Sequence, residues 1–186
     1  MFRIFSVLAI ILIAELIVNA AAAEERSYMF GSVATTRSDI ALGGLNGVDD
    51  DNGGYSVGFG ILLTDNFSVE AAWADYGTHT GQTNCPREIA CVTIPLFSDA
   101  ELKGVSLSLL GSLPLSADWK AYARLGFLSW DVDYEGLSAV FDASDEDLLY
   151  GIGLRWSLSE RWRSFVEYQR VNLDLETASI GVSYHY

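Results

Sequence analysis

Large apolar residues alternate with small or polar ones along the C-terminal part of the chain. From residue 150 onward, Tyr150, Ile152, Leu154 and Trp156 are large, and glycine, arginine or serine stands between them. The last ten residues repeat the pattern, with one phase made of Ala178, Ile180, Val182, Tyr184 and Tyr186. A period of two is typical of a β-strand with one apolar face.

The face opposite the apolar one is too small to be the solvated surface of a soluble sheet. It consists mostly of glycine and serine, with isolated charges such as Arg155. A β-barrel in a membrane has this pattern, because its apolar side chains face lipid while small and polar ones fill a narrow lumen. The pattern therefore favours a transmembrane β-barrel over the alternative, a secreted β-sandwich.

The same alternation predicts eight strands. They cover residues 27–35, 54–63, 67–76, 101–113, 119–132, 148–158, 162–171 and 177–186. Longer connections, at 36–52, 77–100, 133–147 and 172–176, alternate with short turns at 64–66, 114–118 and 159–161. In outer-membrane barrels the short turns are periplasmic and the long loops extracellular. We therefore expect an all-β fold, an eight-stranded antiparallel up-and-down transmembrane β-barrel. The facing of the first strand stays open, because Tyr28 and Phe30 compete with Met29 and Val33 for the lipid side.

The N-terminus resembles an export signal rather than part of the barrel. Arg3 precedes an apolar run over 5–18, and Ala21-x-Ala23 supplies the small residues of a cleavage site. We expect a signal peptide at residues 1–23 and the barrel domain at 24–186. An uncleaved anchor helix is the alternative, but the run is shorter than the ~20 residues that a spanning helix needs.

The charge and the cysteines narrow the function classes further. The 186-residue chain has a net charge of −14, which excludes nucleic acid binding through phosphates. Cys85 and Cys91 are the only cysteines, and in an exported chain they predict a loop disulfide. A metal pair with His79 is the alternative. The acidic run Asp49–Asp51 lacks the downstream glutamate of an EF-hand loop, so we expect no metal site.

Charged residues in the inward phase are the strongest site signal. Glu70, Arg124, Arg155 and Glu167 lie at similar distances from the short turns, and Lys120 and Arg163 lie nearer the periplasmic mouth. Charges removed from water must pair, which predicts an ion-pair network across the lumen. The opposite register of the seventh strand would turn Arg163 and Glu167 toward lipid, at a cost of ~2–4 kcal/mol for an arginine near the midplane.

The segment 151–168 contains Gly-x-Gly-Leu-Arg-Trp followed by Arg-Trp-Arg-x-x-x-Glu-Tyr, and it resembles the penultimate hairpin of OmpA-like outer-membrane β-barrels. Ile180, Val182, Tyr184 and Tyr186 are similar to the C-terminal assembly signal of that class, although the usual last residue is phenylalanine. The resemblance is to stand-alone small barrels of the opacity or OmpX type. It implies the outer membrane of a Gram-negative bacterium, and as partners outer-membrane lipid and lipopolysaccharide, periplasmic chaperones and the barrel-assembly machinery. In such barrels a Glu/Arg/Lys cluster plugs or gates the lumen.

The expected function is that of a non-enzymatic outer-membrane barrel with a structural or surface role. The ion pairs plug the lumen, and the extracellular loops are available to a surface ligand. The alternatives are a narrow porin-like channel and a lipid A-modifying enzyme, which needs a His/Ser or similar cluster at the outer rim. Of the two histidines, His79 lies in a loop without a motif and His185 lies at the periplasmic end. We therefore expect no catalytic residues and no cofactor.

Overall fold

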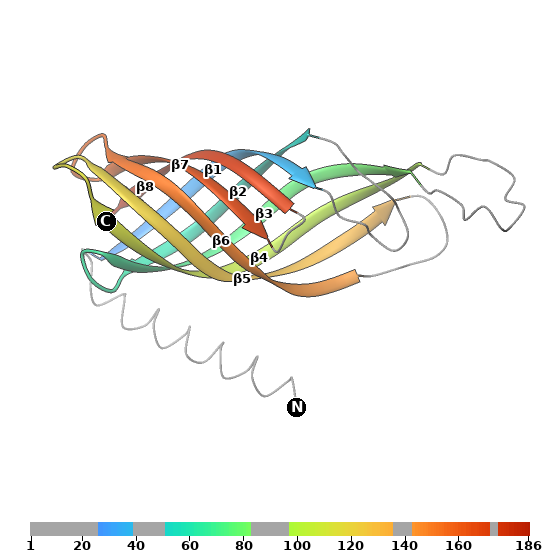
Figure 1. Ribbon diagram of the computed structural model, residues 1–186, viewed down its shortest axis with the longest axis horizontal. Coiled ribbons are helices and arrows are strands. Elements are labelled where there is room, and N and C mark those ends of the chain that lie inside the picture. The colour runs from blue at the N-terminus through green and yellow to red at the C-terminus, as the bar shows by residue number, and fades with distance from the viewer. Residues whose placement is uncertain (1–25, 39–50, 83–96, 136–142, 172–174) are drawn as a thin grey trace, which may run out of the picture.

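The chain forms a closed barrel of eight antiparallel strands (Figure 1). The computed structural model describes residues 26–38, 51–82, 97–135, 143–171 and 175–186. The strands are β1 (Ser27–Ser38), β2 (Asp51–Leu62), β3 (Phe67–Gln82), β4 (Phe97–Pro114), β5 (Trp119–Glu135), β6 (Ala143–Ser157), β7 (Trp162–Val171) and β8 (Leu175–His185). Each strand pairs with its sequence neighbour, and β1 pairs with β8 to close the ring. The predicted fold class is confirmed. No helix within the described ranges is long and apolar enough to cross a membrane.

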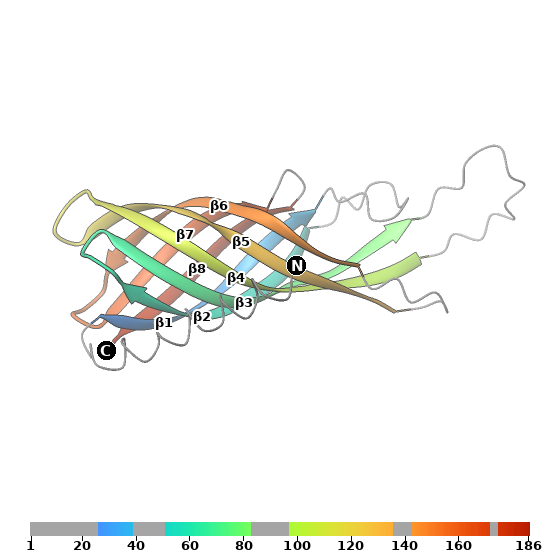
Figure 2. The ribbon, with the colours of Figure 1, turned by 90° about the horizontal axis from the view of Figure 1, so that it is seen from below.

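The strands are longer at the loop end than the sequence predicted. The expected loop at 77–100 is partly strand, because Gln82 still pairs with Phe97, and the expected loop at 133–147 is shortened by pairing as far as Val132 and Ala143. Figures 1 and 2 show β3 to β6 projecting beyond the other four strands at this end. Outside the membrane both faces of a strand meet water, so the alternation that marks a strand disappears from the sequence.

A bulge lies in β3 where this extension begins. The register between β3 and β4 shifts between Asp75 and Thr78, and Gly77 there has a φ of 87°. Glycine adopts this left-handed conformation without the steric cost that a Cβ brings. The Asp75 side chain accepts a hydrogen bond from the Gly77 backbone N–H at 2.9 Å, which fixes the bulge.

The predicted facing of the strands is confirmed. Leu107, Ile152 and Val182 are 41%, 67% and 45% exposed on the outside of the barrel, whereas Arg124 and Glu167 are buried in the lumen. In the first strand Tyr28 and Phe30 point inward, which settles the facing that the sequence left open. The seventh strand takes the predicted register, because Ser157 pairs with Arg163 and keeps its charged residues on the lumen side.

Aromatic side chains pair on the outer surface at both ends of the barrel, and at the loop end the ring centroids of Tyr55 and Trp73 lie 5.6 Å apart. At the short-turn end Trp119 stacks on Trp156 with ring centroids 5.3 Å apart. In the predicted assembly signal, Tyr184 packs against Trp162 at 5.1 Å and against Tyr186 at 5.6 Å, while Ile180 and Val182 are exposed. Aromatic rings prefer the two interfaces of a bilayer, so these pairs mark the edges of the lipid-facing band.

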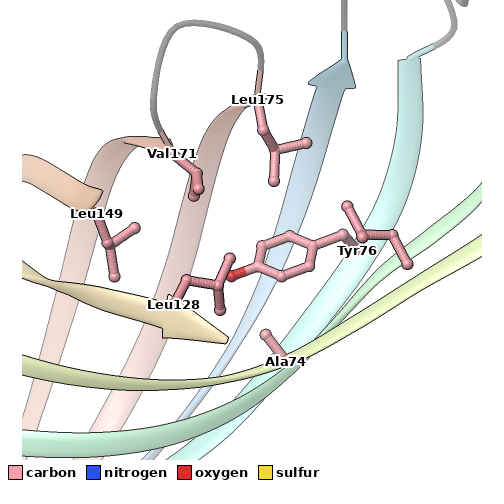
Figure 3. Packing of buried hydrophobic residues seen from close by; sticks show 7 residues of the cluster. Ala74, Tyr76, Leu128, Leu149, Val171 and Leu175 are labelled. Atoms are coloured by element: carbon pink, nitrogen blue, oxygen red, sulfur yellow. The ribbon is translucent and has the colours of Figure 1, made fainter. Parts of the chain in front are cut away.

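The lumen is filled in two layers, and one of them corrects the expectation of a small, polar interior. Towards the loop end, apolar side chains from six strands meet across the lumen (Figure 3). This apolar plug consists of Ala74, Tyr76, Leu102, Leu128, Leu149, Val171 and Leu175, with Trp130 packed against it. A second cluster, Tyr28, Phe30, Leu110, Tyr122 and Phe165, surrounds the charged residues described next. The plug lies where the strands leave the predicted membrane segments.

Candidate functional site

The charged centre of the lumen consists of Glu70, Arg124, Arg155 and Glu167, one residue each from β3, β5, β6 and β7. All four side chains are buried, with Glu70 only 1% exposed. The inward phase of each strand turns them into the lumen, and the antiparallel register sets them at related depths. Glu70 pairs with Ser108, and Ser108 pairs with Gly126, two residues from Arg124. Arg124 pairs with Gly151, and Glu167 pairs with Gly153, two residues from Arg155. The structure thus brings together the four residues that the sequence predicted to pair.

Arg124 joins the two carboxylates. Its Nη2 lies 2.6 Å from Glu70 Oε2, and its Nε lies 2.5 Å from Glu167 Oε1. A further bond from Nη2 to Glu167 Oε2 measures 3.1 Å, so the guanidinium binds Glu167 in a bidentate manner. Such fork-shaped pairs are among the strongest ionic hydrogen bonds in proteins. Because β3 and β7 lie on opposite sides of an eight-strand ring, this contact spans the lumen.

Arg155 completes the charge balance. Its Nη2 lies 3.2 Å from Glu70 Oε1, and its guanidinium carbon lies 5.3 Å and 5.1 Å from the ring centroids of Tyr28 and Tyr122. Cation–π contacts at this range stabilise a desolvated guanidinium. Two carboxylates therefore face two guanidiniums in a site that is neutral as a whole.

Three neutral residues that the sequence did not assign to the network also bind the carboxylates. Tyr28 donates its hydroxyl hydrogen to Glu70 Oε1 at 2.5 Å, and Tyr122 donates to Glu167 Oε2 at 2.7 Å. Gln169 donates from Nε2 to Glu167 Oε1 at 2.9 Å. The two tyrosines could have been found in the sequence. Each lies in the inward phase of its strand, and the adjacent strand carries a glycine that makes room for the ring.

Those glycines make room for the rings. A Cβ at Gly60 would collide with the Tyr28 ring, and one at Gly153 would collide with the Tyr122 ring. The inward face of the strands is therefore rich in glycine because aromatic side chains from adjacent strands lie over those positions. This explains why a face made of small residues encloses no wide pore.

The remaining inward cations lie apart from this group, near the short turns. Lys120 donates from Nζ to the Asp65 carbonyl oxygen at 3.1 Å, at the turn between β2 and β3. Arg163 is the second residue of β7, directly after the turn that follows β6. His185 stacks on Tyr28 with ring centroids 4.6 Å apart and lies 3.4 Å from Ser183 Oγ.

Several predicted features lie outside the described residues. These are the signal peptide at 1–23, the disulfide between Cys85 and Cys91, the acidic residues Asp49 and Asp50, and the side chains of Asp51 and His79. In the part of the chain that the structure covers, no group of three or more His, Cys, Asp or Glu side chains is placed to hold a metal ion.

An outward apolar band, aromatic pairs at both ends and buried ion pairs inside define the class of membrane-spanning β-barrel proteins. Residues 5–186 match the family described as outer membrane protein beta-barrel domain, and the chain belongs to this family. The protein is therefore located in the outer membrane of Gram-negative bacteria. A search of curated protein sequences finds no match to this chain.

Solved structures share the fold at low sequence identity. OprG from Pseudomonas aeruginosa is 17% identical with a TM-score of 0.62, over 88% of this chain and 97% of that one. Ail, the attachment invasion locus protein of Yersinia pestis, is 15% identical with a TM-score of 0.57, over 88% and 99%. Neisserial surface protein A is 15% identical with a TM-score of 0.56, over 86% and 97%. At these identities the likeness concerns the fold alone.

Proposed function

We propose that this protein is a non-enzymatic outer-membrane barrel whose lumen is closed by the charged centre and whose loop end contacts a surface ligand. The contact of Arg124 with both Glu70 and Glu167 carries the first part, because it crosses the lumen from wall to wall. An eight-stranded barrel is only just wide enough inside for its own side chains. A continuous ion path would have to break these buried pairs, which costs several kcal/mol per uncompensated charge.

The recording of ion currents in planar bilayers tests this closure. Purified protein, shown to be folded by its shift on unheated gels, is added to a bilayer of outer-membrane lipids. We expect no current above that of the bare membrane. A porin-like channel would instead give regular conductance steps, and their presence in the wild-type protein would disprove a closed lumen. A preparation purified in the same way from cells that lack this protein is the control for contaminating pores.

The acidic loop end supports a surface role. The described extensions of β4, β5 and β6 carry the carboxylates of Glu101, Asp131, Glu146 and Asp147. Beyond the membrane such a concentration of one sign attracts partners of the opposite charge. A ligand for this end would therefore be cationic. The name of Ail, the attachment invasion locus protein, is compatible with such a role for a barrel of this shape.

The other partners follow from the membrane location. The exposed apolar band would contact outer-membrane lipid and lipopolysaccharide, and the terminal strand with Tyr184 and Tyr186 would be read by periplasmic chaperones and the barrel-assembly machinery. The proposal of a non-enzymatic barrel is supported by the position of His185, which is buried against Tyr28 at the short-turn end. An enzyme acting on lipid A needs its catalytic group at the opposite rim.

A further inference from the structure

The apolar plug forms a layer of its own on the loop side of the charged centre. Its residues come from β3 to β8, and Leu128, Leu149 and Leu175 are at most 2% exposed. Figure 3 shows the Tyr76 ring crossing the lumen between Leu128 and Leu175. On its edge Trp130 is fixed by a 2.8 Å hydrogen bond from Nε1 to Asp147 Oδ2.

A small cavity of about 30 Å³, which we call the chamber, touches both the plug and the charged centre. Its lining includes Arg124, Glu167 and Gln169 as well as Ala74, Asp75 and Tyr76, and it mixes polar with apolar side chains. Its walls carry hydroxyl groups from Ser32, Ser56, Ser106, Thr177 and Ser179. A cavity needs ~10–15 Å³ and several polar partners to hold a water molecule, so this chamber fits one or two.

We propose that the apolar plug is a second seal, separate from the ion pairs, which closes a hydrated chamber from the extracellular side. The inference deepens the proposed function of a closed barrel and rests on it. The charged centre holds its carboxylates through directed bonds to Arg124, Arg155, Tyr28, Tyr122 and Gln169. Apart from the Trp130–Asp147 bond at its edge, the plug holds together by apolar contact, which does not depend on whether those bonds are made.

An apolar constriction stops ions and water by a different means from an ion pair. A narrow ring without polar groups expels water, and an ion cannot enter without losing its hydration shell. The closure at the loop end should therefore persist when the charged centre is disrupted. Conversely, truncation of the plug should open the chamber to the outside while the ion pairs remain.

Chemical labelling of a cysteine placed in the chamber tests whether the plug closes it independently of the charged centre. Ser106→Cys places a thiol in the chamber wall, in full-length protein in which Cys85 and Cys91 are replaced by serine. A small, cationic, membrane-impermeant thiol reagent is then added to the loop side of cells or proteoliposomes. Three variants of this Ser106→Cys protein are compared with it. The plug variant carries both Tyr76→Ala and Leu128→Ala, and the variant of the charged centre carries Glu70→Gln. A lipid-facing control carries both Leu107→Ala and Phe127→Ala. A shift on unheated gels verifies that each form is folded.

We expect the plug variant to be labelled about tenfold faster or more, because the opened fraction sets the rate. The Glu70→Gln and lipid-face variants should be labelled at the rate of the parent protein. The proposal fails if Glu70→Gln speeds labelling as much as the plug variant does, or if the plug variant is labelled no faster than its parent. Ion currents from the wild-type protein would instead disprove the proposed closure of the lumen. Failure of the second seal and failure of the proposed function therefore give different results.

Discussion

The lumen is closed at two levels by opposite kinds of chemistry. In the charged centre, Arg124 is bonded to two carboxylates that tyrosine hydroxyls also bind, and each group depends on its partners. In the plug, Leu128 and its neighbours are buried to a similar degree without a charged group among them. Directed bonds fail when one partner is lost, whereas apolar packing weakens in proportion to the contact removed. The two levels should therefore respond differently to substitution.

The removal of Arg124 gives the largest expected effect. Arg124→Ala leaves Glu70 and Glu167 buried with only part of their counter-charge, which we expect to cost about 3–5 kcal/mol of unfolding free energy. Urea unfolding of the barrel in lipid vesicles measures this. The matched control is Lys103→Ala, because Lys103 lies 2.7 Å from Glu101 and both side chains are over a third exposed. For Lys103→Ala we expect a loss of about 0–1 kcal/mol of unfolding free energy. Equal losses in the two variants would show that the charged centre contributes no more than a surface pair.

Truncation within the plug comes next. Leu128→Ala should cost about 2–5 kcal/mol, because it loses both the transfer energy and the contacts around the resulting cavity. Leu107 is the same residue type on the lipid-facing side of the adjacent strand β4, where it is 41% exposed. Lipid chains fill the space that Leu107→Ala leaves, so this variant should lose only the transfer energy. The same urea titration compares the two, and an equal cost would mean that the plug is loosely packed.

The sequence predicted the charged centre but not the plug, for a physical reason. Glu70, Arg124, Arg155 and Glu167 stand out as charges in an inward phase, and charges in a lumen must pair. Leu128 and Leu149 also point inward, but each comes directly after a lipid-facing apolar residue, Phe127 or Leu148. In the sequence, the inward leucine therefore cannot be told apart from its lipid-facing neighbour. Two adjacent apolar residues interrupt the period-two alternation, so the sequence does not indicate which side each of them faces.

The first strand and the long loops show two further limits of the pattern. Tyr28, Met29 and Phe30 are consecutive large residues, so period two gives no preferred face, and the bond from Tyr28 to Glu70 is visible only in three dimensions. Directly after residue 76, residues 77–83 consist of Gly, Thr, His and Gln, a composition that is typical of loops. The extended pairing between Thr78 and Glu101 follows from the continuation of the barrel register, which local composition does not encode.

The smallest expected effect comes from the removal of a single hydroxyl group at each level. Tyr122 and Tyr76 are similarly buried, but Tyr122 donates a hydrogen bond to Glu167 whereas Tyr76 lies among the apolar residues of the plug. Tyr122→Phe removes one bond to a charged acceptor and keeps the ring under Arg155, so we expect a loss of about 1–2 kcal/mol in urea unfolding. Tyr76→Phe should change the unfolding free energy by less than about 0.5 kcal/mol. If Tyr76→Phe were instead the more damaging of the two, the plug would depend on a polar contact of its own, and the distinction between a bonded centre and an apolar seal would not hold.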